Sequence, residues 1–242
     1  MGYSLGSDAQ PLPRRIFSVP HPPVKRALFL TLEAAFVEAW RWLHAEPWLA
    51  FDAKTAAEVD YTAQLHVILQ DHLLDNEVVP GFTEDAFTSI DRIETVNFDG
   101  TKKSKRPDLI ARLPLAHRDR VQPTQDGIFI ECKCVDDGST RLTDYCKHGI
   151  TRFTAGDYAW AMAEALMVGY NNVHPKPSEA LAGPFRSQAK VVHPVGTLHD
   201  CPSNPHQPPV AISRHKRTFP VGAGGQLASP IQLRHLWLAA PS

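Results

Sequence analysis

Residues 128–135, which read IFIECKCV, constrain the fold of this chain more than any other segment. They form an apolar, strand-like run that nevertheless contains two opposite charges, Glu131 and Lys133. Because side chains alternate across a strand, both charges share one face with Phe129, while Cys132 faces the opposite layer. Burying a charge is unfavourable unless the charge is paired or bound to a metal. The segment therefore predicts a buried strand with a polar site on one face.

Helical spacing of apolar residues dominates the first third of the chain. Residues 24–46 are rich in Ala, Leu and Glu and lie between two prolines, which predicts one helix. A second helix is expected over residues 53–74, with Tyr61 and Leu65 on its apolar stripe. Residues 1–23 contain five prolines and little periodicity, so an extended arm is expected there.

Shorter apolar runs separated by turn residues follow Gly81. Asp99 and Gly100 predict a hairpin-type turn between the first two of three consecutive strands, for which antiparallel pairing is plausible. A third helix is expected over residues 154–171, where Thr154 and Asp157 resemble a capping box. The expected strands lie at residues 87–100, 106–114, 126–135, 189–196, 209–217 and 232–240.

This order of helix, three strands, helix and further strands predicts an α/β (α+β) fold with a central mixed β-sheet flanked by helices. A chain of 242 residues suits one elaborated domain. We expect an N-terminal arm and helix over residues 1–50 and the main domain over 51–242. Within that domain, the core should span about 54–170, and added C-terminal strands should span 185–242.

Composition excludes several classes of protein. The formal net charge of −1 and the pI near 6.9 argue against the broad basic surface of a non-specific DNA coater, so contacts with a polyanion must be local. No apolar run approaches the length of a membrane span, and the N-terminus does not resemble a signal peptide, so we expect a cytoplasmic protein without membrane contact. Four cysteines are too few to staple a chain of this size, and we interpret them as reduced thiols.

Asp108 supplies a second carboxylate for the polar strand. It follows Pro107 and begins a strand-like run 23 residues before Glu131, so two carboxylates and the Lys133 ammonium can converge on neighbouring strands. Oxygen ligands of this kind suit Mg²⁺, which lowers the pKa of a bound water. The alternative is that Asp108 caps a turn while Glu131 and Lys133 form a surface ion pair.

These residues resemble the signature of the PD-(D/E)xK nuclease superfamily, read here as Pro107-Asp108 and Glu131-Cys132-Lys133 on successive strands after a helix. The resemblance covers about residues 54–170 and implies a restriction-endonuclease-like core with an N-terminal helical extension and added C-terminal strands. It implies a metal-dependent endonuclease that uses Mg²⁺, with Mn²⁺ able to substitute, and that cuts DNA in preference to RNA. Asp108 and Glu131 would bind the metal, with the backbone carbonyl of Cys132 as a third ligand, and Lys133 would activate or orient the attacking water.

The superfamily usually places one more acid on the helix before the sheet, and this chain offers Glu58 and Asp60. At about 100° per residue, Glu58 falls near the centre of the apolar stripe of the second expected helix, whereas Asp60 lies on the far side. We therefore predict Glu58 as the additional catalytic acid and metal ligand, with Asp60 as the alternative.

Basic and aromatic residues near the motif are candidates for substrate binding. Lys147, Arg152 and Tyr158 follow the charged strand, where Arg152 is suited to clamp a phosphate. Lys105 and Arg106 belong to a run of four positive charges directly before Asp108, which favours attraction of a phosphate backbone. The structural alternatives are a core position for Tyr158, and solvated charges for Lys147 and the basic run.

Other interpretations remain open or are disfavoured. His193, His199, Cys201 and His206 match no zinc-finger spacing, so a zinc site there is not expected. The alternative function is a catalytically silent nucleic-acid-binding or assembly module with the same fold, because fold alone never proves activity. A homodimer is compatible with cutting two strands, although no sequence feature requires one.

Overall fold

The structure is a computed structural model, and the positions that it describes lie between residues 21 and 239. Most of the expected N-terminal arm and the middle of the connection before the charged strand lie outside the described residues. No helix within the described part is long and apolar enough to cross a membrane. The described residues are 21–45, 51–52, 55–74, 76–114, 123–135, 139–172, 176–201, 208–221 and 225–239.

A seven-stranded mixed β-sheet forms the centre of the molecule, in the order β1-β2-β3-β4-β9-β6-β5. The first three strands are antiparallel, as expected, whereas β3, β4 and β9 run parallel. The last three strands in the order pair antiparallel, and β7 and β8 form a separate two-stranded ribbon. The strands are β1 Ser89–Asp91, β2 Leu109–Arg112, β3 Gly127–Cys134, β4 Glu164–Asn172, β5 His199–Asp200, β6 Val210–His215, β7 Pro220–Val221, β8 Gln226–Leu227 and β9 Ile231–Ala239.

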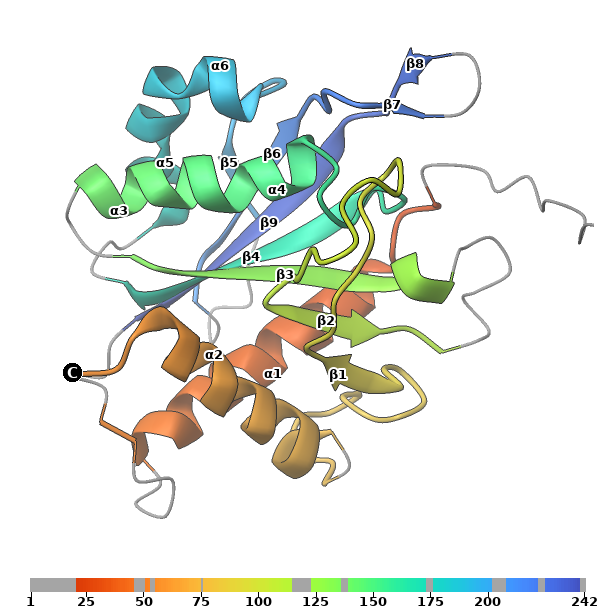
Figure 1. The fold of residues 1–242 in the computed structure, drawn as a ribbon. Helices are drawn as coiled ribbons and strands as arrows, with labels where there is room; N and C mark the ends of the chain where they lie inside the picture. The colour runs from red at the N-terminus through yellow and green to blue at the C-terminus, as the bar shows by residue number, and fades with distance from the viewer. Residues whose placement is uncertain are drawn as a thin grey trace, which may run out of the picture.

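Helices cover both faces of this sheet, as Figure 1 shows. The N-terminal helices α1 and α2, with the π-helical segment η2, share one apolar core with β2, β3 and β4. The segments α3, η5, α4 and α5 share the second core with the opposite face of the sheet. The helices are α1 Arg26–Ala45, α2 Glu58–Val67, η2 Ile68–Leu73, η4 Pro123–Gln125, α3 Ser139–Asp144, η5 Tyr145–Ile150, α4 Thr151–Thr154, α5 Pro177–Ser187 and α6 Ala189–Val192.

The α/β (α+β) architecture with a central mixed sheet and flanking helices is therefore confirmed. The helix expected over 24–46 is present as α1. Five of the six expected strands are present, as β2, β3, β6, β9 and, in much shorter form, β1. The turn at Gly100 is also present, with φ +77° at that residue and an antiparallel bridge between Thr95 and Lys105. The second helix begins later than expected, at Glu58.

The helix expected over 154–171 is wrong. Helical structure ends at Thr154, and β4 runs from Glu164 to Asn172. A strand that is buried on both faces reads as a continuous apolar run, and periodicity alone does not separate it from a buried helix. The strand expected over 189–196 is also wrong, because α6 occupies its first half and ends at His193 in a left-handed conformation (φ 48°).

The centre of the sheet is packed closely at Gly169 of β4, which pairs with Lys133 of β3. A Cβ atom on Gly169 would lie 2.6 Å from Trp237 and 2.9 Å from Val135, well inside normal contact. The glycine therefore allows the side chains above β4 to approach the backbone directly beside the charged strand.

We predict that Gly169→Ala lowers the free energy of unfolding by about 1–3 kcal/mol, because overpacking forces Trp237 or the strand to shift. Gly183→Ala in α5 is the matched control, since nothing lies within 4 Å of the added Cβ. An alanine inside a helix should instead stabilise by about 0.5–1 kcal/mol. Urea denaturation measures both; equal stability changes in the two variants would contradict the packing argument.

Candidate functional site

The site begins where β3 extends beyond its neighbour β2. The last ladder pair of these strands joins Leu109 to Ile130, so the β2–β3 ladder ends before Glu131. At this point the Asp108 carboxylate accepts a hydrogen bond from the Cys132 N–H at 2.7 Å, in place of a backbone carbonyl of β2. The Cys132 N–H thus has an acceptor beyond the end of the ladder, and the Asp108 carboxylate is held beside Glu131 and Lys133.

Glu58 satisfies the next exposed N–H group of the same strand. It is the first residue of α2, and its Oε2 atom accepts a hydrogen bond from the Cys134 N–H at 3.1 Å. Asp60, the alternative acid, instead accepts a hydrogen bond from the Ala57 N–H at 2.9 Å and so caps the same helix. The structure therefore brings Glu58, and not Asp60, to the charged strand.

The Lys133 ammonium lies at the point where these acids converge. Its Nζ atom is 2.8 Å from Glu58 Oε1, 2.8 Å from the Cys132 carbonyl oxygen and 3.0 Å from Glu131 Oε1. Asp108 Oδ2 lies farther away, at 3.9 Å. We call these four oxygen-bearing groups the oxygen cage; its three carboxylates outnumber the one ammonium, so the cage attracts further positive charge.

Burial and mutual repulsion raise the pKa values of two carboxyl groups of the cage, Glu131 and Asp108. Burial raises the pKa of Glu131 to about 7, and the Asp108 carboxylate adds to this rise. Burial also raises the pKa of Asp108, against the opposing effects of Lys133 and the Cys132 N–H. Burial lowers the pKa of Lys133, but Glu131, Asp108 and Glu58 outweigh it and hold the pKa above its usual value. Lys133 is therefore an ammonium at neutral pH.

Tyr158 supports Glu131 from inside the protein. Its side chain is almost completely buried, and its hydroxyl donates a hydrogen bond to Glu131 Oε2. The predicted contact of Tyr158 with substrate stays a prediction, and in this structure its hydroxyl is occupied by Glu131. The structural alternative for this residue, a core aromatic, is the one that the structure supports.

Asp157 gathers three basic side chains directly beside Tyr158. Lys105 and Arg152 contact its Oδ2 atom at 2.9 and 3.2 Å, and Lys102 contacts Oδ1 at 3.2 Å. We call these four residues the basic cluster. Asp157 is not part of the expected helical capping box; its carboxylate instead joins the hairpin of Lys102 and Lys105 to the end of α4. Two more cations than anions meet here, next to the oxygen cage.

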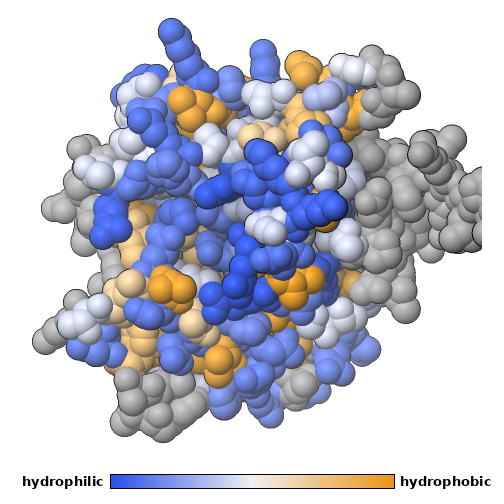
Figure 2. Space-filling view, in the orientation of Figure 1, coloured by the Kyte–Doolittle hydropathy of each residue, from blue (hydrophilic) through white to orange (hydrophobic). Residues whose placement is uncertain are grey.

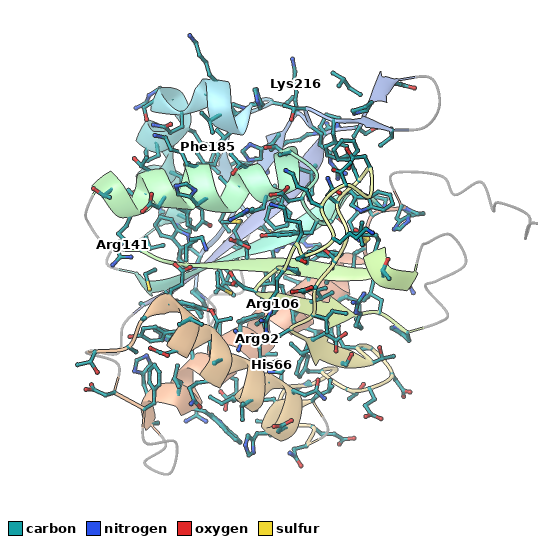
Figure 3. The ribbon with its side chains drawn as sticks, viewed as in Figure 1. His66, Arg92, Arg106, Arg141, Phe185 and Lys216 are labelled. Atoms are coloured by element: carbon teal, nitrogen blue, oxygen red, sulfur yellow. The ribbon has the colours of Figure 1, made fainter. Side chains whose placement is uncertain are left out.

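Further cations lie on the surface near the motif. Lys147 on η5 and Arg106 before β2 are both exposed, and Figure 3 shows Arg106 and Arg92 on the part of the molecule that contains β2 and β3. Arg92 was not singled out from the sequence, yet its charge lies close enough to lower the pKa of Asp108. In Figure 2, strongly hydrophilic residues gather across the middle of this face.

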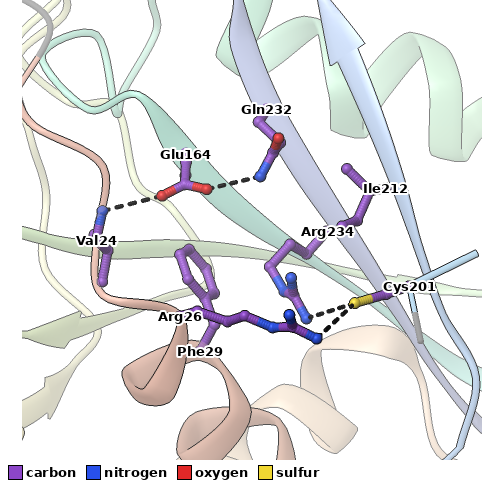
Figure 4. A pocket seen from close by; sticks show the side chains of 8 residues that line it. All are labelled: Val24, Arg26, Phe29, Glu164, Cys201, Ile212, Gln232 and Arg234. Atoms are coloured by element: carbon purple, nitrogen blue, oxygen red, sulfur yellow. Dashed lines mark hydrogen bonds between the residues drawn. The ribbon is translucent and has the colours of Figure 1, made fainter. Parts of the chain in front are cut away.

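A separate cavity of about 230 Å³ lies near the N-terminal helix. Figure 4 shows Cys201 there, with Arg26 and Arg234 at 3.9 and 3.8 Å from its Sγ atom. Arg234 is already paired with buried Glu33 at 2.6 Å, so its charge serves the fold. None of the residues expected at the nuclease motif lines this cavity.

A buried polar network connects η5 with the C-terminal strands. His235 contacts the Tyr145 hydroxyl at 2.8 Å and Ser213 at 2.7 Å, and Ser213 contacts His215 at 2.6 Å. All four side chains are buried, so this network has a structural role. The zinc interpretation of the C-terminal histidines gains no support from the described residues, and His206 lies outside them.

We predict a pH dependence of stability from Glu131, measured with a chelator present. Its folded pKa of about 7 lies above the ordinary value of 4.5, so the stability that it contributes is complete at low pH and is lost as the pH rises through about 7. The free energy of unfolding of the wild type, relative to Glu131→Gln, should therefore fall between about pH 5 and pH 8. A constant difference between the wild type and Glu131→Gln across this pH range would contradict the shift.

The donor set of the cage fits the metal that the motif implies. Its carboxylate and carbonyl oxygens are the hard ligands that Mg²⁺ and Mn²⁺ prefer. Within the described part of the chain, no three His, Cys, Asp or Glu side chains are arranged to hold a metal as they stand; here the oxygens converge on the ammonium of Lys133. No family model, curated protein or solved structure matches the chain, so the interpretation of the cage rests on its own chemistry.

Proposed function

We propose that this protein is a metal-dependent endonuclease of the PD-(D/E)xK kind that hydrolyses phosphodiester bonds, with DNA favoured over RNA. The observation that carries the proposal is the convergence of Asp108, Glu131, Glu58 and the Cys132 carbonyl on the Lys133 ammonium. The order of helix, three antiparallel strands, helix and a strand parallel to the third supports a restriction-endonuclease-like core around this cage.

The oxygen cage would hold the divalent cation. Asp108, Glu131 and the Cys132 carbonyl would supply its ligands, and Glu58 would supply a further carboxylate. A bound Mg²⁺ or Mn²⁺ lowers the pKa of a water ligand and polarises the scissile phosphate.

Lys133 acts in this scheme as a hydrogen-bond donor. Because the surrounding carboxylates hold its pKa above the usual value, it is an ammonium at neutral pH while it lies in the cage. The ammonium orients the attacking water and offsets the negative charge that develops on the phosphoryl oxygens. Tyr158, through its hydrogen bond to Glu131, keeps that carboxylate turned toward the cage.

The basic cluster is the proposed contact for the nucleic-acid backbone. Lys102, Lys105 and Arg152 converge on one carboxylate, which is the charge and shape that a phosphate diester also offers. We assign the exposed side chains of Arg106 and Lys147 to the same contact. Since the whole chain has a net charge of only −1, such local clusters are how it can attract a polyanion.

Cleavage assays test the proposed activity. Purified protein is incubated with plasmid, linear duplex, single-stranded DNA and RNA, each with Mg²⁺, Mn²⁺ or chelator. We expect metal-dependent cleavage of DNA, and Asp108→Ala and Lys133→Ala should each slow it by at least about 100-fold. Lys190→Ala on α6 is the charge-matched control and should cut like the wild type.

Two outcomes would count against this proposal. Identical nicking by wild type, Asp108→Ala and Lys133→Ala would point to a contaminating nuclease. Tight DNA binding without cleavage under any metal condition would favour the alternative, a catalytically silent binding or assembly module.

We predict that Asp157→Asn tightens binding of a DNA duplex at low salt by several-fold, because it removes the anion that competes with phosphate for three cations. Asp200→Asn makes the same change in net charge on β5, at the edge of the sheet opposite β1. It should have little effect on DNA binding. Fluorescence anisotropy measures both. Weaker binding by Asp157→Asn would mean that the carboxylate is needed to hold the cluster together, and that phosphate does not take its place.

A further inference from the structure

Lys133 and the expected metal require the same oxygen atoms. The ammonium is 2.8–3.0 Å from Glu58 Oε1, Glu131 Oε1 and the Cys132 carbonyl oxygen, and its side chain is only 12% exposed. A Mg²⁺ ion takes oxygens at about 2.0–2.1 Å. A cation so close to these oxygens would leave no room for an ammonium at the same point, and two positive charges would repel each other strongly there.

The carboxylates themselves are held independently of the ammonium. Asp108 Oδ2 is fixed by the Cys132 N–H, and Glu58 Oε2 by the Cys134 N–H. Tyr158 holds the second oxygen of Glu131. Each acid therefore has one oxygen anchored to the protein while another oxygen faces the ammonium, except that Asp108 Oδ2 does both. The cage keeps its shape when its central cation changes.

The lysine side chain is suited to leave without moving the strand. The first carbons of its side chain pack near η5. A Cβ atom built on Gly149 of η5 would lie 3.7 Å from Lys133 Cγ. Beyond Cγ, the flexible stem can rotate the ammonium away from the cage while the backbone of β3 stays paired with β4.

We propose that Lys133 is an internal cation that occupies the oxygen cage until a divalent metal displaces it. The same event that fills the cage then frees the ammonium to reach the water and the phosphate. Metal binding and the release of the Lys133 ammonium are thus one coupled step. Without metal, the catalytic lysine stays in ion pairs with the carboxylates of the cage. This inference rests on the proposed function for the presence of the metal, but it concerns the order of events within the site.

Displacement makes the lysine a competitor of the metal. Without the ammonium, three carboxylates face one another, and a divalent cation enters without expelling a charge. Lys133→Met should therefore bind Mn²⁺ at least about tenfold more tightly than the wild type. Lys190→Met, which makes the same change in net charge on α6, should bind it like the wild type.

Isothermal titration calorimetry with Mn²⁺ measures these affinities, with folding of each variant checked by circular dichroism. Affinity of Lys133→Met that is equal to or weaker than that of the wild type would overturn the displacement. The double variant Asp108→Asn, Lys133→Met should lose the gain; retention of the gain would place the metal outside the cage and would also overturn the proposal.

A second measurement uses the wild-type protein alone. Acetic anhydride labels accessible lysines, and mass spectrometry quantifies the labelling of Lys133 with Mn²⁺ or with chelator. We expect labelling of Lys133 to rise several-fold with Mn²⁺, while Lys190 serves as an internal reference and stays constant. Unchanged labelling of Lys133 at Mn²⁺ concentrations that saturate binding would overturn the displacement.

The results separate this inference from the proposed activity. If Mn²⁺ displaces Lys133 but no nucleic acid is cleaved, the displacement stands and the proposed nuclease activity is contradicted. If the wild type shows metal-dependent cleavage but Lys133→Met binds Mn²⁺ with unchanged affinity, the nuclease activity stands and the displacement is contradicted.

Discussion

The ion cluster around the Lys133 ammonium is the constraint on which the site depends. One buried cation is held by oxygens from the start of α2, from the residue before β2 and from β3 itself. Removing a charge from water is unfavourable, so the partners must be present for the strand to be buried at all. The cluster therefore fixes both the position of α2 against the sheet and the point at which β2 begins.

The edge of β3 explains why the cluster forms at this point. Beyond Ile130 the strand has lost its β2 neighbour, and its N–H groups need acceptors. Two carboxylates, from Asp108 and Glu58, supply them. A feature that completes the backbone hydrogen bonding of the sheet thus also collects negative charge, and the basic cluster around Asp157 places positive charge one residue from Tyr158. In the proposed nuclease, the oxygen cage attracts the metal, and the basic cluster attracts the phosphate backbone.

The wrong prediction of a helix over residues 154–171 has a physical cause. Residues 165–170 of β4 are buried on both faces of the sheet. Such a run has neither the alternation of a half-exposed strand nor a polar face to mark its period. Helical segments immediately before it, from Ser139 to Thr154, made a continued helix a plausible interpretation. The strands β3, β6 and β9 were predictable because turn residues limit them. The arm of residues 1–20 lies outside the described part of the structure.

The sequence by itself determined that Glu131 and Lys133 share one face of a buried strand, because alternation is a property of the extended backbone. It also indicated Asp108 as their neighbour and Glu58 as the helix residue on the apolar stripe. Only the tertiary structure decided that all of these acids converge on the ammonium, that Tyr158 supports Glu131 from the core, and that Asp157 draws three cations together. These contacts join residues up to 75 positions apart in the chain, and their distances follow from how helices pack on the sheet, which no local pattern specifies.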